Sequence, residues 1–122
     1  MNKAQTKSIL ILDDDPAIIE ALSLLLEDAG YTMRTLSEGE TLENMHAELP
    51  GVVLLDIWMS GKDGRDVCTL LKSQETTRDI PIILISAHRD LECIAKEAGA
   101  DDFLAKPFGM REVVAKLGKY LA

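Results

Sequence analysis

The sequence is short of cysteines, of long hydrophobic runs and of basic residues, and each shortage limits what the protein can be. Two isolated cysteines, Cys68 and Cys93, lie on predicted helices. We expect both to be small buried residues in a reducing cytosol, with a disulfide or a metal-binding pair as the alternative. No apolar run approaches the roughly 18 residues that a membrane span needs. The polar start does not resemble a signal peptide, so we expect a cytoplasmic protein without a membrane partner.

The chain carries 13 Lys and Arg residues against 21 Asp and Glu residues, which gives a formal net charge of −8. Because the basic residues are scattered, direct binding to nucleic acid is not expected. A length of 122 residues and a hydrophobic content of 47% suit one domain with its own core. No linker, repeat or low-complexity segment interrupts the pattern. We therefore predict a flexible N-terminal segment over 1–7 and one domain over 8–122.

Apolar runs alternate with helical patterns along the chain. Runs at 9–12, 52–55 and 82–85 are rich in Val, Ile and Leu without polar alternation, which is typical of parallel strands buried on both faces. A less apolar edge strand is expected at 31–36 and a short one at 103–105. Helical spacing predicts helices over 16–29, 38–48, 65–73, 89–98 and 109–121. The sum is an α/β fold, a (βα)5 doubly wound, flavodoxin-like three-layer sandwich with parallel strand order 2-1-3-4-5.

Several residues mark the ends of these helices. Asp15 can cap the first helix, and Pro16 suits its first turn. Gly30 and Gly99 are placed to end the first and fourth helices. Gly118 lies inside the last helix and should weaken it by about 0.5–1 kcal/mol relative to alanine.

Polar residues follow four of the apolar runs, at the point where each strand ends. They are Asp13 and Asp14 after 9–12, Asp56 after 52–55, Ser86 after 82–85 and Lys106 after 103–105. The carboxyl ends of parallel strands meet at one edge of the sheet, where ligands bind in open α/β folds. We therefore expect these groups to share a pocket. Three carboxylates, a hydroxyl and an ammonium group suit a divalent cation and a phosphoryl group.

The crowded carboxylates need compensation. Without it, some of them would hold a proton at neutral pH, and a bound cation relieves that cost. A hard site with few protein ligands suits Mg²⁺, and Mn²⁺ could substitute. Asp56 is the candidate nucleophile, because a carboxylate can attack phosphorus and form an acyl phosphate. Lys106 would stabilise charge on the transferring group, and Ser86 can donate a hydrogen bond to it.

The sequence resembles a response-regulator receiver domain of two-component signalling over nearly its whole length. The segments that carry the resemblance are ILDDDP at 11–16, LDIWMSGKDG at 55–64, ISA at 85–87 and GADDFLAKPF at 99–108. The resemblance implies that Asp56 is the phosphoacceptor. It also implies that Asp13 and Asp14 serve the metal, with Asp14 the more direct ligand. Asp56 and the backbone carbonyl of Trp58 would complete the protein's share of the coordination.

The resemblance further implies a switch. Ser86, with Ala87 beside it, takes the position of the switch hydroxyl in the phosphoryl-binding group, and Lys106 that of the phosphate-binding lysine. Ser86 would move toward the phosphoryl group and Phe103 would turn into the space left behind. Tyr is usual at this position, and Phe has no hydroxyl, so the balance of states should rest on packing. Phe103 as an ordinary core or strand-edge aromatic is the alternative.

Two positions near the acceptor are expected to tune hydrolysis of the acyl phosphate. Trp58 is large and is expected to shield the phosphoryl group, with an exposed contact for a partner as the alternative. His88 either contacts the phosphoryl group or a partner, or is a solvated loop residue. Ser60 stands where this family commonly has Pro, so a more mobile loop is expected there.

The leading hypothesis is a phosphoryl-accepting switch rather than a turnover enzyme. Its donor would be a histidine kinase or histidine phosphotransfer protein. Its output would be a protein target or a self-dimer through helix 4 (89–98), strand 5 (103–105) and helix 5 (109–121) in the predicted order. A stand-alone receiver and a piece of a longer regulator or hybrid kinase both fit the sequence.

Three other functions are less consistent with the sequence. A binding module on the same fold that ignores phosphorylation is the main alternative, and the intact acidic, hydroxyl and lysine set argues against it. A hydrolase of the haloacid dehalogenase type needs a second Asp two residues after the nucleophile, where Trp58 stands. A flavin carrier needs a phosphate-cradling loop after the first strand, where the acidic residues 13–15 would repel the flavin phosphate.

Overall fold

The computed structural model describes residues 8–34, 49–59 and 61–121. Five parallel strands form one sheet in the order β2-β1-β3-β6-β7. Their bounds are β1 Ser8–Leu12, β2 Thr32–Arg34, β3 Val52–Asp56, β6 Ile82–Ser86 and β7 Asp102–Ala105. Counted along the chain, this is the predicted order 2-1-3-4-5. The described helices are α1 Pro16–Asp28, α2 Gly64–Ser73, α3 Leu91–Ala98 and α4 Met110–Tyr120.

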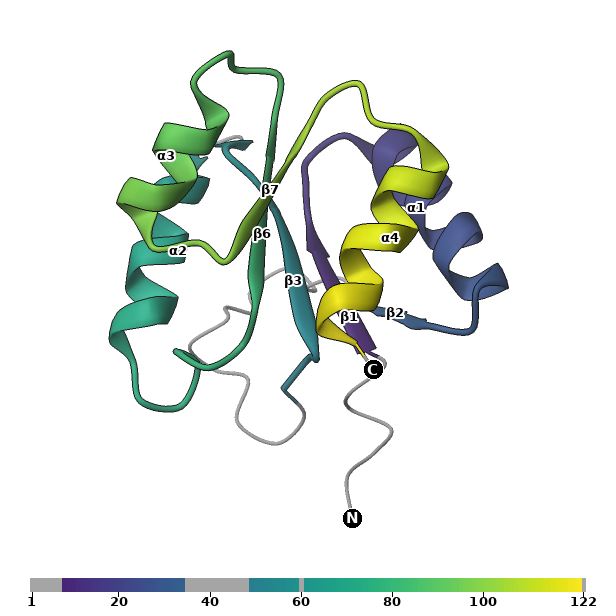
Figure 1. Ribbon diagram of the computed structural model, residues 1–122, viewed down its shortest axis with the longest axis horizontal. Helices are drawn as coiled ribbons and strands as arrows, with labels where there is room; N and C mark the ends of the chain where they lie inside the picture. The colour runs from purple at the N-terminus through teal and green to yellow at the C-terminus, as the bar shows by residue number, and fades with distance from the viewer. Residues whose placement is uncertain (1–7, 35–48, 60, 122) are drawn as a thin grey trace.

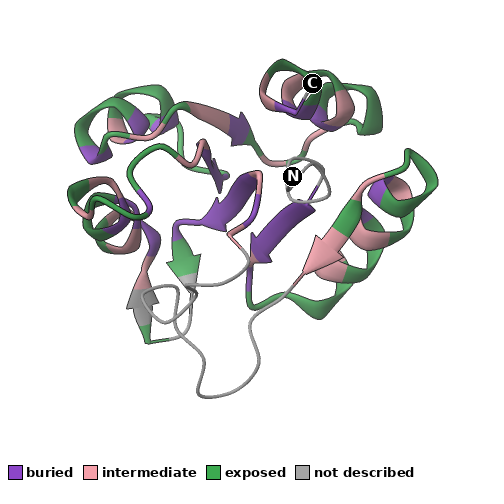
Figure 2. Cartoon of the chain, turned by 90° about the horizontal axis from the view of Figure 1, so that it is seen from below, coloured by how far each residue is buried: buried purple, intermediate pink, exposed green. Residues whose placement is uncertain are grey.

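The helices cover both faces of the sheet, as Figure 1 shows. One core cluster joins the sheet to α1 and α4, and the other joins it to α2 and α3. Every residue of β3 and β6 is buried, so these strands form the centre of three layers (Figure 2). The three-layer α/β prediction is confirmed. The helix predicted over 38–48, the segment 1–7 and Ser60 lie outside the described residues.

The helix ends follow the predicted signals. Asp15 is the N-cap of α1, and its Oδ1 accepts a hydrogen bond from the amide of Ala17 at 3.0 Å. Gly99 ends α3 in the left-handed conformation with φ of +85°, which a side chain would disfavour. The cysteine prediction is half right. Cys68 is buried, but Cys93 is exposed, because it lies two residues after the buried Leu91 and so on the opposite side of the helix.

A small hairpin after β3 was not predicted. Trp58–Met59 (β4) pairs antiparallel with Lys62–Asp63 (β5), and Trp58 lies opposite Asp63. Two-residue strands are too short for a hydrophobic period to identify them. The hairpin carries the chain from the end of β3 into α2, so it borders the carboxyl edge of the sheet.

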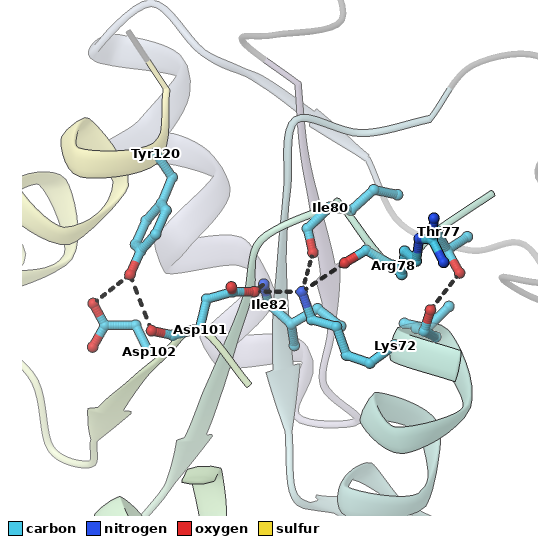
Figure 3. Close-up of polar contacts among 9 residues, drawn as sticks. Lys72, Thr77, Arg78, Ile80, Ile82, Asp101, Asp102 and Tyr120 are labelled. Carbon is cyan, nitrogen blue, oxygen red and sulfur yellow. Dashed lines mark hydrogen bonds and ion pairs between the residues drawn. The ribbon is translucent and has the colours of Figure 1, made fainter. Parts of the chain in front are cut away.

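The amino edge of the sheet is tied together by one lysine. The ammonium of Lys72 donates to the carbonyl oxygens of Arg78 and Ile80, at 3.1 and 2.9 Å, and pairs with Asp101 at 2.6 Å (Figure 3). Asp101 also accepts a hydrogen bond from the amide of Ile82. These contacts link α2, the loop before β6 and the start of β7, opposite the edge that carries the acidic residues.

Replacing Gly118 with alanine should raise the free energy of unfolding by about 0.5–1 kcal/mol. The helix α4 continues through this exposed position, and an added Cβ would meet no atom within 4 Å. Urea denaturation of the two proteins measures the difference. Gly64→Ala is the opposite case, because a Cβ there would lie 2.2 Å from the main-chain oxygen of Asp56. The prediction is wrong if Gly118→Ala leaves the urea midpoint unchanged or lowers it.

Candidate phosphoryl-acceptor and metal site

Three carboxylates gather at the carboxyl edge of the sheet. Asp13 and Asp14 follow β1 and Asp56 ends β3, and one oxygen of each lies within 4.8 Å of the others. Asp13 and Asp56 are buried, with exposures of 8% and 5%, whereas Asp14 is exposed. The register explains their proximity: Leu12 pairs with Leu55, so the residues that follow these two are neighbours.

The loop after β1 orients the first of these carboxylates. The backbone amide of Asp15 donates a hydrogen bond to Oδ1 of Asp13 at 2.9 Å. Asp15 itself caps α1, so the start of that helix holds the Asp13 side chain inside the pocket. Asp14 turns toward solvent, which leaves it accessible to a ligand that arrives from outside.

Lys106 brings a positive charge to the same cluster from the end of β7. Its Nζ lies 3.3 Å from Oδ2 of Asp13 and 3.7 Å from Oδ1 of Asp56. Its backbone amide donates to the carbonyl oxygen of Ser86 at 2.9 Å, which extends the strand pairing by one residue. The Lys106–Pro107 peptide bond is cis. The fold brings Lys106 next to Asp13, although the two residues are 93 positions apart in the chain.

The environment of Asp56 disfavours its negative charge. Burial raises the pKa of this carboxyl above its ordinary value of 3.8, and the charge of Asp13 raises it further. Lys106 and a hydrogen bond from the Trp58 backbone lower the same pKa without cancelling the rise. The ammonium of Lys106 therefore offsets only part of the effect of burial and of Asp13 on this carboxyl.

A close approach of the backbone keeps the acceptor loop compact. The amide of Gly64 donates to the carbonyl oxygen of Ile57 at 2.7 Å, and Gly64 has no room for a side chain against the main chain of Asp56. Sequence reasoning did not single out Gly64. The Asp-Gly pair at 63–64, a frequent turn signal, could have indicated it.

Trp58 is 56% exposed, and its ring is not packed into the core. The guanidinium of Arg65 lies 5.1 Å from the ring centroid, within the range of a cation–π contact. Asp63 holds Arg65 through three hydrogen bonds, the shortest of 2.6 Å. The indole is thus held at the start of α2, and neither Arg65 nor Asp63 was expected in this role.

The remaining predicted residues line β6, the loop after it and β7. Ser86 is buried, and its Oγ accepts a hydrogen bond from the amide of His88 at 3.0 Å. Ala87 and His88 are exposed, and Nδ1 of His88 accepts from the amide of Asp90. Phe103 lies three residues before Lys106, outside the acidic cluster, and packs half-buried against the core under α2 and α3.

The donor set fits a small divalent cation. Three carboxylates offer hard oxygen ligands, two are buried, and burial together with the charge of Asp13 raises the pKa of Asp56. Magnesium commonly takes one or two carboxylates and keeps several waters, which suits a cluster with one acid open to solvent.

None of the helices among the described residues has the length and apolar character to cross a lipid bilayer.

The family model of the response regulator receiver domain matches residues 9–118. The phosphate regulon transcriptional regulatory protein PhoB of Pseudomonas aeruginosa is 40% identical over 117 residues, covering 91% of this chain and 50% of that protein. The DNA-binding dual master transcriptional regulator RpaA of Synechocystis is 37% identical over 112 residues, covering 89% and 46%. This chain therefore spans about half the length of these curated relatives.

Solved structures with the same fold include two receiver domains. That of a signal transduction histidine kinase from Syntrophus aciditrophicus has a TM-score of 0.83 and 30% identity, covering 94% of this chain and 89% of its own. That of NtrX from Brucella abortus has a TM-score of 0.80 and 30% identity, covering 93% and 97%.

Replacing Asp56 with asparagine should stabilise the folded protein at neutral pH when divalent cations are chelated. A carboxyl whose pKa is raised on folding opposes folding once it ionises. This penalty is absent below the ordinary value of 3.8, grows as the pH rises from that value to the raised pKa of the folded state, and is constant above it.

Thermal unfolding of both proteins between about pH 4 and about pH 8 measures this effect. The Asn variant should melt at the higher temperature at neutral pH, and the gap should close toward the acidic end. A gap of the same size across the whole range would contradict the explanation.

Proposed function

The chain belongs to the response regulator receiver domain family, and on that premise we propose that it is a phosphoryl-accepting signalling switch with Asp56 as the acceptor. One observation carries the proposal. A buried carboxylate at the end of the central strand β3 lies beside two further acids and within 3.7 Å of a lysine ammonium. This arrangement can stabilise a phosphoryl group on Asp56, and helix capping does not explain it.

The reaction is a transfer between two side chains. An oxygen of Asp56 attacks phosphorus of a phosphohistidine donor, an O–P bond forms, and the N–P bond of the donor breaks. The leaving imidazole nitrogen keeps the electron pair of that bond. Hydrolysis reverses the phosphorylation: water attacks phosphorus, the acyl O–P bond breaks, and the carboxylate and inorganic phosphate are released. The protein returns to its starting state when its acyl phosphate is hydrolysed. It is not a turnover enzyme in the ordinary sense.

The residues that would hold the cation are Asp13, Asp14 and Asp56, with the backbone carbonyl of Trp58. Mg²⁺, or Mn²⁺ in its place, would supply positive charge to phosphoryl oxygens in the pocket. Lys106 lies between the two buried acids and is placed to bind another phosphoryl oxygen. Lys106 also offsets part of the negative charge of the pocket when Asp56 is unmodified.

The switch would begin at the end of β6. The Oγ of Ser86 accepts a hydrogen bond from the amide of His88, and its O–H can still donate to a phosphoryl oxygen. Ala87 follows in the same segment. Phe103 would then turn toward the space beside Ser86, and the surface made by α3, β7 and α4 would change.

We place the protein in the cytoplasm, with a histidine kinase or histidine phosphotransfer protein as the donor. The downstream partner would be a protein target or a second copy of the chain, bound through the α3, β7 and α4 surface. The domain would extend over 8–122. Because the curated relatives are about twice as long, their outputs are not assigned to this chain.

Incubation with acetyl phosphate and Mg²⁺ should add the mass of one phosphoryl group, and peptide mapping should place it on Asp56. Asp56→Asn should abolish the addition. Lys106→Met should slow it by about 10²-fold, because removal of one preorganised donor has an effect of that size. Intact-mass spectrometry follows all three proteins. An unmodified native protein, or a phosphoryl group on another residue, would overturn the proposed function.

Trp58→Asn should shorten the lifetime of the acyl phosphate, because a small side chain shields Asp56 from water less than an indole does. Trp58→Phe keeps an aromatic ring and is the matched control. The decay of phosphorylated protein after removal of the donor gives the rates. Equal decay of the native and Asn proteins would remove Trp58 from the account of hydrolysis.

A further inference from the structure

Phe103 is contacted by a lysine from the opposite face of the sheet. Its ring packs with the core cluster under α2 and α3, whereas Lys116 belongs to α4, which covers the other face. The strand β7 is at the edge of the sheet, with α4 on one face and α3 on the other (Figure 1). A side chain from α4 can therefore reach around it. The Nζ of Lys116 lies 5.1 Å from the centroid of the Phe103 ring, within the range of a cation–π contact.

The ammonium group is fixed in this position by Asp102. Nζ of Lys116 donates to Oδ1 of Asp102 at 2.8 Å, with the two side chains 23% and 10% exposed. The hydroxyl of Tyr120 donates to the other oxygen at 3.0 Å, which Figure 3 shows, and the amide of Phe103 donates to Oδ1 at 2.8 Å. Burial would raise the pKa of Asp102, but these hydrogen bonds outweigh it and hold the pKa below its ordinary value.

A hollow of about 110 Å³ borders Phe103, lined by residues of α3, of the turn after it and of β7. Packing therefore leaves space beside Phe103, although the ring also contacts the core cluster under α2 and α3. The contact with Lys116 is a directional interaction that the ring has to leave if it turns toward Ser86.

We propose that Lys116 is a positioning residue that holds Phe103 in its present position and so favours the unphosphorylated arrangement of the domain. The inference rests on the proposed function and specifies how that switch is regulated. A phenylalanine has no hydroxyl with which to fix its orientation, and the ammonium group over its face supplies a substitute. The free energy of the contact is lost when the ring moves, so it opposes activation by that amount.

The test uses the affinity for beryllofluoride, a phosphoryl mimic, in the presence of Mg²⁺, followed by Trp58 fluorescence. Lys116→Met keeps the apolar stem and removes the cation, and it should bind beryllofluoride about two- to fivefold more tightly. Lys116→Arg keeps a cation that stacks on aromatic rings, so it should bind like the native protein. Lys119→Met is the matched control, because Lys119 pairs with the same Asp102 at 3.6 Å, whereas the cation–π contact with Phe103 comes from Lys116.

The outcomes separate this inference from the proposed function. Unchanged affinity in Lys116→Met, or equal tightening in Lys119→Met, would overturn the role of Lys116. A native protein that ignores beryllofluoride, or an Asp56→Asn variant that responds like the native protein, would instead overturn the function. A structural role would shift thermal unfolding without shifting affinity, so both are measured on each variant.

A second variant keeps the test decisive if Lys116→Met folds poorly. Phe103→Leu removes the ring and retains apolar bulk, and the cation then has no aromatic face to contact. In that background, Lys116→Arg and Lys116→Gln should have equal affinities for beryllofluoride, whereas with Phe103 present the Arg variant should bind more weakly than the Gln variant. The same Arg–Gln difference in both backgrounds would show that the ring is not what Lys116 holds.

Discussion

The repulsion among three carboxylates at the end of two buried parallel strands is the constraint on which this molecule depends. Asp13 and Asp56 are carried into the interior by β1 and β3, and Asp14 adds a third charge at the rim. The ammonium of Lys106 compensates part of this charge, at 3.3 Å from Asp13 and 3.7 Å from Asp56. A divalent cation would relieve this repulsion, and the cation and Lys106 together would then bind an anionic phosphoryl group on Asp56.

The short edge strand β7 connects that site to the surface where a signal would leave. Lys106 follows the strand, Phe103 lies within it, and Asp102 begins it. The amino end of β7 is anchored through Asp101, which pairs with Lys72 and accepts the amide of Ile82. One end of the strand is therefore fixed to neighbouring elements, while the other contacts groups whose charge changes on phosphorylation. This difference makes β7 a suitable element to transmit a change at Asp56.

Much of the fold and the location of the site could be predicted because they follow from local patterns. Unbroken apolar runs identify strands buried on both faces, and the residue after each run falls at the carboxyl edge whichever side chains surround it. Contacts that depend on packing could not be predicted from these local patterns. The β4–β5 hairpin is too short for a period, and the close approach at Gly64 and the exposure of Cys93 depend on which side of a helix meets the sheet.

Strand order, the gathering of the acids near Lys106 and the capping of α1 were already implicit in the order of residue types, because a parallel α/β sheet allows few alternatives. Only the tertiary structure decided two cation–π contacts. In one, Lys116 reaches around the sheet edge to Phe103, and in the other Arg65 contacts Trp58. Long charged side chains have many rotamers, and hydrophobic periodicity carries no information about where they end. Their positions are selected by neighbours such as Asp102 and Asp63, which only the folded chain brings within reach.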